Sequence, residues 1–262
     1  MPEFWLGLFL LGFTVAFGTY LLALRIRLFA LVDTIWAGGL GVAAAVYYAL
    51  TAPENLRGTA ALLIMLFWSG RLTVHLLRDR ILAGKEDPRY AALAQHWGDR
   101  ARFRFLFVFL GQVPLIALFL LPFTLAVDHT HADWRLLDSI GLLIGLLALA
   151  GEMLADRQLA RFRADPENAG RVCRRGLWRY SRHPNYFFEW LHWFAYVAFA
   201  FGLALGWLSL LGPVMMYVFL RYVTGVPFAE RSSLKSRGGE FRDYQETTNT
   251  FFPWKPRRDR NS

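Results

Sequence analysis

Five ionisable side chains lie inside long apolar stretches of the sequence, where a charge is costly and is usually kept for function. They are Asp33, Arg71, His75, Glu152 and Glu189. Arg71 and His75 are one helical turn apart and share a helix face with Trp68. An imidazole beside a carboxylate can donate a proton to a substrate, so this group predicts acid–base chemistry. The alternative is an Asp33–Arg71 ion pair that only joins two helices.

A second group occupies residues 176–189, which read G-L-W-R-Y-S-R-H-P-N-Y-F-F-E. Pro184 suits the first position of a helix, and the free N–H groups of that turn would suit an anion such as pyrophosphate. The Asn185 amide could bond a carboxamide, and Glu189 follows one turn later on the same face. A simple interfacial anchor of basic and aromatic residues is the alternative, but it does not account for a buried Glu189.

The elements that carry these residues are long and apolar. Hydrophobic residues make up 55% of the 262 residues and charged residues only 19%. Their blocks have about the length that crosses a bilayer as a helix. Seven blocks qualify: residues 5–24, 28–50, 59–82, 105–127, 139–155, 186–204 and 208–226. We therefore predict an all-α polytopic membrane protein, a seven-transmembrane-helix bundle that forms one domain over residues 1–262 with a tail at 227–262. A soluble enzyme is excluded, and the lone Cys173 excludes an internal disulfide.

The net charge of +9 is distributed unevenly along this bundle. Of the 29 Lys and Arg residues, 26 fall in segments that seven crossings place on one side. The positive-inside rule makes that side cytoplasmic and the N-terminus outside. Part of this charge alternates with aromatic residues near residues 174–186 and 241–244, which suits a phosphate-bearing nucleotide in a cavity open to the cytosol. Topology alone is the simpler explanation, and nucleic acid is disfavoured so close to a membrane.

The one sizeable outer loop carries His129 and His131, with Asp128 and Asp133 nearby. Two histidines at this spacing could hold a metal ion on a strand, but no cysteine or third histidine supports them. We therefore predict a solvated loop and no metal site.

The residues 176–189 resemble the C-terminal domain of the steroid 5-alpha-reductase superfamily, and most closely its bacterial membrane proteins of unknown function (the DUF1295 type). The resemblance includes residues 182–186 (R-H-P-N-Y), residues 220–221 (L-R), residues 241–244 (F-R-D-Y) and residues 251–254 (F-F-P-W). Upstream, residues 86–90 (E-D-P-R-Y) match the bacterial branch.

The resemblance implies an integral-membrane reductase that binds NADPH and reduces an activated carbon–carbon double bond in a steroid-like or other lipid. It places the enzyme in the bacterial inner membrane with its cofactor on the cytoplasmic side, without an obligate protein partner. The residues that it assigns to the cofactor are Asp156, Arg163, Arg171, Arg182, His183, Asn185, Tyr186, Glu189, Arg221, Glu230 and Tyr244.

The family's catalytic glutamate and tyrosine correspond to Asp33 and Trp68 in this sequence. Trp68 cannot donate a proton, so this departure argues against steroid turnover. We predict that His75, on the same helix face as Trp68 and Arg71, donates the proton instead and that Asp33 orients it.

Two other functions remain open. Membrane methyltransferases of the isoprenylcysteine or phospholipid type share the R-H-P-x-Y core and bind S-adenosylmethionine, and Glu230 would then hold the methionine amine. The abundance of arginine argues against them, because this methyl donor has no phosphate. A lipid-binding scaffold or transporter would need neither cofactor, but the sequence lacks the interrupted helices and inverted repeats of transporters.

Overall fold

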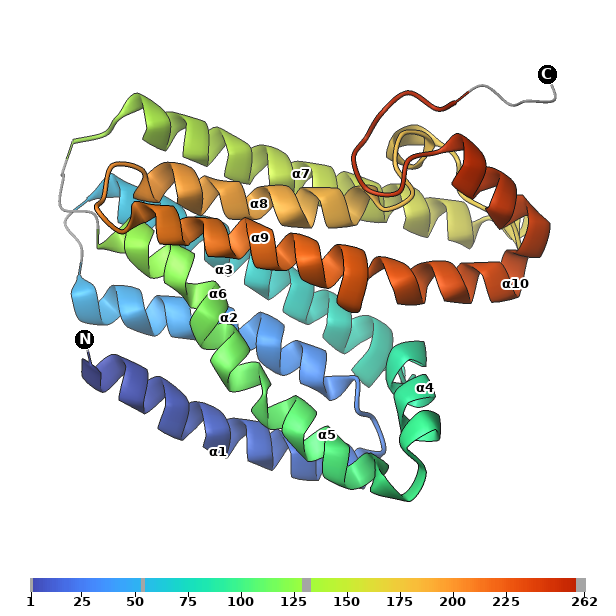
Figure 1. Ribbon diagram of the computed structural model, residues 1–262, viewed down its shortest axis with the longest axis horizontal. Coiled ribbons are helices and arrows are strands. Elements are labelled where there is room, and N and C mark those ends of the chain that lie inside the picture. The colour runs from blue at the N-terminus through green and yellow to red at the C-terminus, as the bar shows by residue number, and fades with distance from the viewer. Residues whose placement is uncertain (1, 53–54, 129–132, 258–262) are drawn as a thin grey trace. The chain divides into compact units, whose positions relative to one another are not determined.

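The computed structural model describes residues 2–52, 55–128 and 133–257, and this part of the chain is helical without strands. Figure 1 shows the long helices by label. The α-helices are α1 (Pro2–Ile26), α2 (Leu31–Thr51), α3 (Leu56–Leu76), α4 (Pro88–Trp97), α5 (Ala101–Leu110), α6 (Gln112–Val127), α7 (Leu136–Ala164), α8 (Pro184–Ala200), α9 (Leu211–Val218) and α10 (Val226–Thr247). The chain forms two compact units, one of Met1–Asp138 with Phe199–Leu211 and one of Ser139–Ala198 with Gly212–Ser262.

The predicted class, a polytopic bundle of membrane-crossing helices, is confirmed. By length and composition, the described residues contain 6 helices that could cross a membrane. The predicted sixth span corresponds to α8, which has only 17 residues. The predicted span 208–226 is divided among a 3-10 turn (Gly206–Leu210), α9 and a π turn (Phe219–Val223). Hydropathy predicts the length of an apolar segment, but it does not predict whether the segment forms an α-helix, a 3-10 turn or a π turn.

Two further differences from the predicted spans concern helix ends. The predicted span 105–127 lies in two helices, α5 and α6, which meet at Gly111, a residue that itself keeps right-handed helical dihedral angles. The predicted span 139–155 is only the apolar part of α7, which continues to Ala164 through turns rich in arginine. The stretch before α5, predicted as a loop, contains the amphipathic helix α4.

In the first unit, α2 and α3 approach closely through small residues. An ideal Cβ on Gly41 would lie 2.3 Å from the Ser69 Oγ, so only glycine fits there. The Ser69 hydroxyl donates to the Ala37 carbonyl oxygen at 2.6 Å, which ties the two helices together. Small residues and hydroxyl hydrogen bonds of this kind hold membrane helices together where water supplies no hydrophobic driving force.

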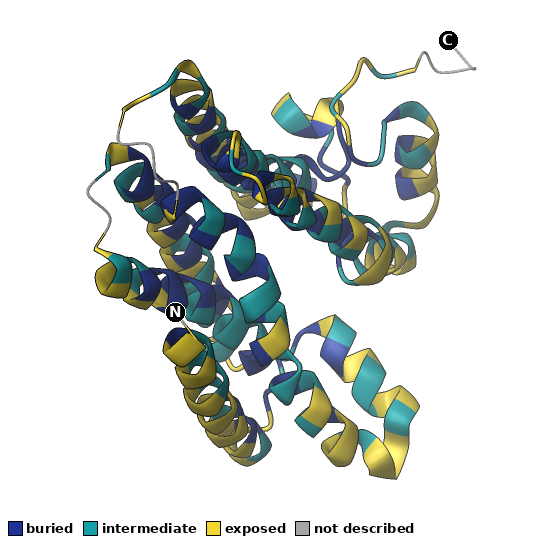
Figure 2. Cartoon of the chain, turned by 60° about the vertical axis from the view of Figure 1, so that its left-hand side comes forward, coloured by how far each residue is buried: buried dark blue, intermediate teal, exposed yellow. Residues whose placement is uncertain are grey.

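Most of α1 presents apolar side chains outward. Only Phe4, Ala16, Tyr20 and Ala23 are buried, and Figure 2 shows the exposed remainder along the helix. The helix ends in a left-handed cap, where the Leu28 N–H bonds the Ala23 carbonyl and Arg27 has φ +58°. Glycine is the usual residue at this position, and a side chain there costs about 1–2 kcal/mol.

At the opposite end of this unit, one carboxylate holds two arginines. The Asp138 side chain, 0% exposed, accepts from the Arg57 Nε at 2.8 Å and Nη2 at 2.9 Å. It also accepts from the Arg135 backbone N–H at 2.8 Å and Nη2 at 3.0 Å. Arg57 and Arg135, the two basic residues in the predicted outer loops, therefore form a structural ion network with Asp138.

The second unit is built on α7, α8, α9 and α10. The Gly151 site on α7 has no room for a side chain, because an ideal Cβ would lie 2.4 Å from the Phe188 ring on α8. The Trp178 indole N–H donates to the Ala155 carbonyl at 2.9 Å and fastens the loop before α8 to α7. Helix α10 bends at Gly238, which has φ +48°. The Val172 N–H donates to the Glu240 carboxylate at 3.0 Å and the Arg174 Nη2 to the Glu240 carbonyl at 2.6 Å, which holds the loop at 172–183 beside α10.

Candidate functional site

Arg182 is the centre of the candidate site in the second unit. Its side chain is 8% exposed, and all three guanidinium nitrogens are used. Nε donates to the Glu230 carboxylate at 2.7 Å, Nη1 to the Gln245 carbonyl at 3.0 Å and also to the Thr248 carbonyl, and Nη2 to the Thr250 hydroxyl at 2.8 Å. Arg182 therefore holds together α10 and the segment that follows it.

Glu230 on α10 connects Arg182 with two other side chains. Its Oε1 lies 3.2 Å from the His183 Nε2, and its Oε2 accepts from the Gln245 amide at 2.6 Å. Burial lowers the pKa of His183 below its usual value, and the Glu230 carboxylate offsets this only in part. The imidazole is therefore neutral near pH 7, and its ring stacks on Tyr186 with centroids 5.2 Å apart.

The C-terminal segment closes over this network through backbone bonds. The Ser181 hydroxyl donates to the Phe251 carbonyl at 2.8 Å, and the Trp254 N–H donates to the Tyr180 carbonyl at 3.0 Å. The Tyr244 hydroxyl donates to the carbonyls of Trp178 and Ser181. Arg182, His183, Glu230 and Tyr244 were each predicted to contact a cofactor, and the structure brings them together as one internally bonded cluster.

Three arginines gather beside this cluster without an acidic partner, and we refer to Arg163, Arg174 and Arg237 as the arginine group. The Nε atoms of Arg174 and of Arg237 on α10 are buried, and no acceptor in the described part of the chain reaches them. The positive charge of Arg237 opposes that of Arg163 on α7. The Arg174 guanidinium lies 5.4 Å from the centre of the Tyr244 ring. Within the described residues, none of the three forms an ion pair with a carboxylate. Like charges brought together in this way favour an anionic ligand.

Asn185 presents a second feature that suits a ligand. It lies in the first turn of α8, directly after Pro184 at the helix start. Its side-chain oxygen is buried, and no donor in the described part of the chain reaches it. A buried amide oxygen without a hydrogen bond is costly, so a ligand N–H donor would be stabilised here.

The other predicted cofactor residues are also in the second unit. Asp156 and Glu189 are half-buried on α7 and α8, and Arg171 is exposed in the loop that follows α7. The Arg221 guanidinium lies 5.1 Å from the centre of the Tyr222 ring. Of the predicted phosphate ligands, Arg163 belongs to the arginine group, whereas Arg182 is saturated by protein partners.

In the first unit, Asp33 lies in a compact ionic cluster. It accepts hydrogen bonds from the Arg89 Nη2 at 2.6 Å, the Tyr90 hydroxyl at 2.6 Å and the Arg80 Nη1 at 3.0 Å. Arg80 and Arg89 also pair with Asp87. Burial alone would raise the pKa of Asp87, but the hydrogen bond from Arg89 and the two positive charges hold it below its usual value.

The neighbouring Glu86 caps α2 from a distance in sequence. Its carboxylate accepts from the Phe29 N–H at 2.5 Å and from the Ala30 N–H at 2.8 Å, the free groups at the start of that helix. A carboxylate is favoured there by the helix dipole. Residues 86–90 therefore join the loop before α4 to the beginning of α2.

The predicted pairing of Asp33 with His75 is corrected by these contacts. Asp33 is bonded to Arg80, Arg89 and Tyr90, whereas the His75 Nδ1 lies 3.4 Å from Asp79 with the imidazole 51% exposed. Helical spacing predicts the face on which His75 lies, but it does not predict which carboxylate is its partner. Trp68 is fully buried, with its ring edge-on to Trp36 at 5.5 Å, and Arg71 is half-buried.

A family model described as "Protein of unknown function (DUF1295)" matches residues 19–248. The chain belongs to the DUF1295 family. The matched range contains every residue predicted for the site, from Asp33 to Tyr244. No curated protein and no solved structure matches the chain.

The sequence analysis missed several members of both clusters. In the second unit these are Arg174, Arg237, Gln245, Thr248 and Thr250. In the first unit they are Arg80, Asp87, Arg89 and Tyr90, although residues 86–90 had been noted as a motif. The surplus of arginine over acidic residues in these segments was the one available signal for Arg174 and Arg237.

The predicted absence of a metal site concerns His129 and His131, which lie outside the described residues. Within the described ranges, no group of three or more metal-binding side chains occurs.

Proposed function

We propose that the chain is an integral-membrane, NADPH-dependent reductase that acts on an activated carbon–carbon double bond of a lipid. The observation that carries this proposal is the arginine group, in which the Nε atoms of Arg174 and Arg237 are buried without a hydrogen-bond partner in the described part of the chain. Guanidinium groups bind phosphate through paired hydrogen bonds. The 2′-phosphate or pyrophosphate of a dinucleotide suits such a site.

The residues around the arginine group fit the rest of this cofactor. The buried Asn185 side-chain oxygen needs an N–H donor, which the carboxamide of a nicotinamide offers. When bound, NADPH supplies a hydride. The saturated residues Arg182, His183 and Glu230 then act as positioning residues, because their bonds fix the C-terminal segment and α10 around the loop at 172–183.

Glu230 also bears on the methyltransferase alternative. In that function its carboxylate would hold the methionine amine of S-adenosylmethionine. Both oxygens of Glu230 already accept hydrogen bonds, from Arg182, His183 and Gln245. A ligand amine would have to displace one of these buried partners, which disfavours this function.

Reduction of an enone also needs a proton donor, because charge develops on the carbonyl oxygen as the β-carbon is reduced. We assign this role to His75, with Asp79 as the carboxylate beside it. The Asp33 cluster holds the loop before α4, so Asp33 is a positioning residue. Trp68 is fully buried beneath the helix face that carries His75, so it supports this face and does not itself meet a lipid substrate.

The proposal is tested by titrating the protein, purified in detergent, with NADPH, NADH and S-adenosylmethionine. We expect NADPH to bind most tightly. Arg237→Gln should weaken NADPH binding by about tenfold, equal to about 1.4 kcal/mol, and should affect NADH less if the arginine group holds the 2′-phosphate. Arg161→Gln is the matched control, since Arg161 is an exposed arginine of α7 outside the group.

His75→Ala should abolish lipid-dependent NADPH oxidation while NADPH binding is kept. Tight binding of S-adenosylmethionine without binding of NADPH would overturn the reductase proposal in favour of the methyltransferase. The same outcome would also show that the arginine group does not bind the phosphates of NADPH.

A further inference from the structure

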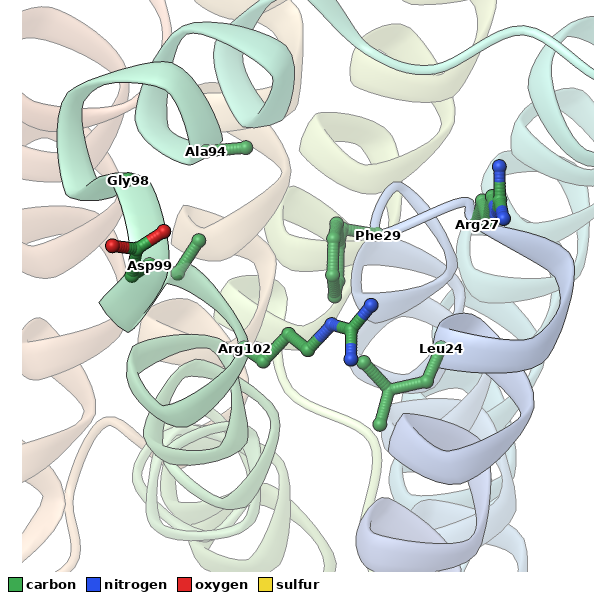
Figure 3. A pocket seen from close by; sticks show the side chains of 8 residues that line it. Leu24, Arg27, Phe29, Ala94, Gly98, Asp99 and Arg102 are labelled. Carbon is green, nitrogen blue, oxygen red and sulfur yellow. The ribbon is translucent and has the colours of Figure 1, made fainter.

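A pocket opens at the end of α1 in the first unit, and none of the residues that line it is assigned to the reductase. Its cavity volume is about 620 Å³. Leu24, Arg27 and Phe29 line one wall, and Asp99 and Arg102 line the other. Figure 3 shows the Arg102 side chain extending from the start of α5 towards Phe29 and Leu24. The pocket therefore combines two guanidinium groups with apolar walls.

Neither arginine is needed for the fold around it. In the described part of the chain, no carboxylate forms an ion pair with the side chain of Arg27 or Arg102. Arg27 also occupies the left-handed cap of α1, where its φ of +58° would suit glycine better. The positive-inside rule accounts for the charge of the two residues, but it does not account for a side chain at a strained position that suits glycine, and this strain points to a ligand.

The apolar wall of the pocket is held rigidly. The Phe29 ring stacks on Phe105 with centroids 3.8 Å apart, and the Phe29 N–H is bonded to Glu86. On the other side, the Tyr20 hydroxyl donates to the Arg102 carbonyl at 3.0 Å and fixes α5 against α1. The site is therefore shaped before any ligand arrives, which reduces the entropy lost on binding.

The position of the pocket identifies the kind of ligand. It lies where the candidate membrane span Pro2–Ile26 ends and where α5 begins. Phe103 and Phe107 of α5 are 64% and 58% exposed, and Leu22 of α1 is 48% exposed. An apolar surface therefore continues from the charged pocket along both helices. A molecule with an anionic head and apolar chains matches this arrangement better than a soluble anion does.

We propose that this pocket binds the headgroup of a membrane glycerophospholipid. Arg27 and Arg102 pair with the phosphodiester, Leu24 and Phe29 contact the glycerol and the first chain carbons, and Asp99 accepts a hydrogen bond from a headgroup hydroxyl or ammonium. The side chains of Arg27, Asp99 and Arg102 together carry one net positive charge, which balances one phosphodiester. Phosphatidylglycerol and phosphatidylethanolamine offer such donors, and phosphatidylcholine does not.

Lipid retention by the purified full-length protein tests this proposal. The protein in detergent is titrated with phosphatidylglycerol, phosphatidylethanolamine or phosphatidylcholine, and bound lipid is counted by native mass spectrometry. We expect the first two lipids to bind more tightly than the third, and Arg102→Gln to weaken them by about tenfold. Arg100→Gln removes the same charge two residues away, outside the pocket lining, and should change nothing.

Arg27→Gly separates the ligand role from a structural one. It should weaken lipid binding as Arg102→Gln does, yet keep or raise the melting temperature, because glycine relieves the strained cap. Equal lipid binding by the wild type and both variants would overturn the proposal, as would equal binding of phosphatidylcholine. Competition by millimolar inorganic phosphate alone would assign the site to a soluble anion and overturn the lipid assignment. NADPH titration of the same variants should be unaltered.

Discussion

His183 shows how one buried residue can make the stability of the second unit depend on pH. Its folded-state pKa lies below the usual value of about 6.5 because burial disfavours the imidazolium. Below about pH 6.5, the unfolded chain therefore binds a proton that the folded protein resists. Linkage then requires the free energy of unfolding to fall as the pH drops through this range.

We expect this loss in melting temperature scans of the detergent-purified protein between about pH 5 and pH 8. His183→Gln should flatten the acid side of the profile, since glutamine does not titrate there. The exposed His96 on α4 provides the control, because His96→Gln should leave the profile of the wild type unchanged. An unaltered acid loss in His183→Gln would assign the effect to another group.

The chemistry of single residues was easier to predict than their partners. The motif at 182–186 marked Arg182 and His183 as part of a site, because basic and aromatic residues cluster there. Their bonds to Glu230, Gln245 and Thr248 join positions far apart in the chain, and no local pattern specifies such pairs. The partners of Asp33 were equally hard to predict, because its ion pairs with Arg80 and Arg89 depend on the conformation of the loop before α4.

At the scale of elements, the α2–α3 contact depends on the absence of one side chain. Gly41→Ala would place a methyl group against the Ser69 Oγ and Cβ, at 2.3 and 2.9 Å. Ser69 cannot turn away without losing its bond to Ala37. We expect Gly41→Ala to destabilise the protein by about 1–3 kcal/mol, measured as a lower melting temperature in detergent.

Gly18→Ala is the matched comparison within the membrane helices. Nothing lies within 4 Å of an ideal Cβ at this position of α1. Alanine should therefore be neutral or stabilise by about 0.5–1 kcal/mol through its better helix propensity. If both substitutions had the same effect, the contact between α2 and α3 would not be the reason for glycine at position 41.

Element boundaries followed from the sequence only where apolar length decides them. The first three predicted spans correspond to α1, α2 and α3 because each is one uninterrupted apolar block. The junction of α5 and α6 at Gly111 and the π turn at Phe219–Val223 arise from packing and backbone winding. Hydropathy does not contain that information, so the region from residue 206 to 226 was predicted least well.

For the whole molecule, the charge distribution predicts which side of the membrane each end of a helix faces. The two basic residues of the predicted outer loops, Arg57 and Arg135, are both bonded to Asp138 and so oppose the orientation weakly. We therefore expect residue 3 to face outside and residue 85 to face the cytosol.

Cysteine labelling measures this orientation directly. Cys173 is buried, and burial raises the pKa of its thiol, so the wild type should not react with a membrane-impermeant maleimide. In a Cys173→Ser background, Glu3→Cys should be labelled on intact cells and Lys85→Cys only in inverted vesicles. Labelling of both positions from one side would contradict the predicted topology.

The bonds of Arg182 to residues 245–250 also set an order for biosynthesis. Helices α7 and α8 leave the ribosome before residues 245–250 have been synthesised. Until then, Arg182 lacks the hydrogen-bond acceptors that this segment provides. During that interval the arginine is exposed to lipid headgroups and water. The proposed cofactor site in this unit is therefore complete only after residues 245–250 have been made.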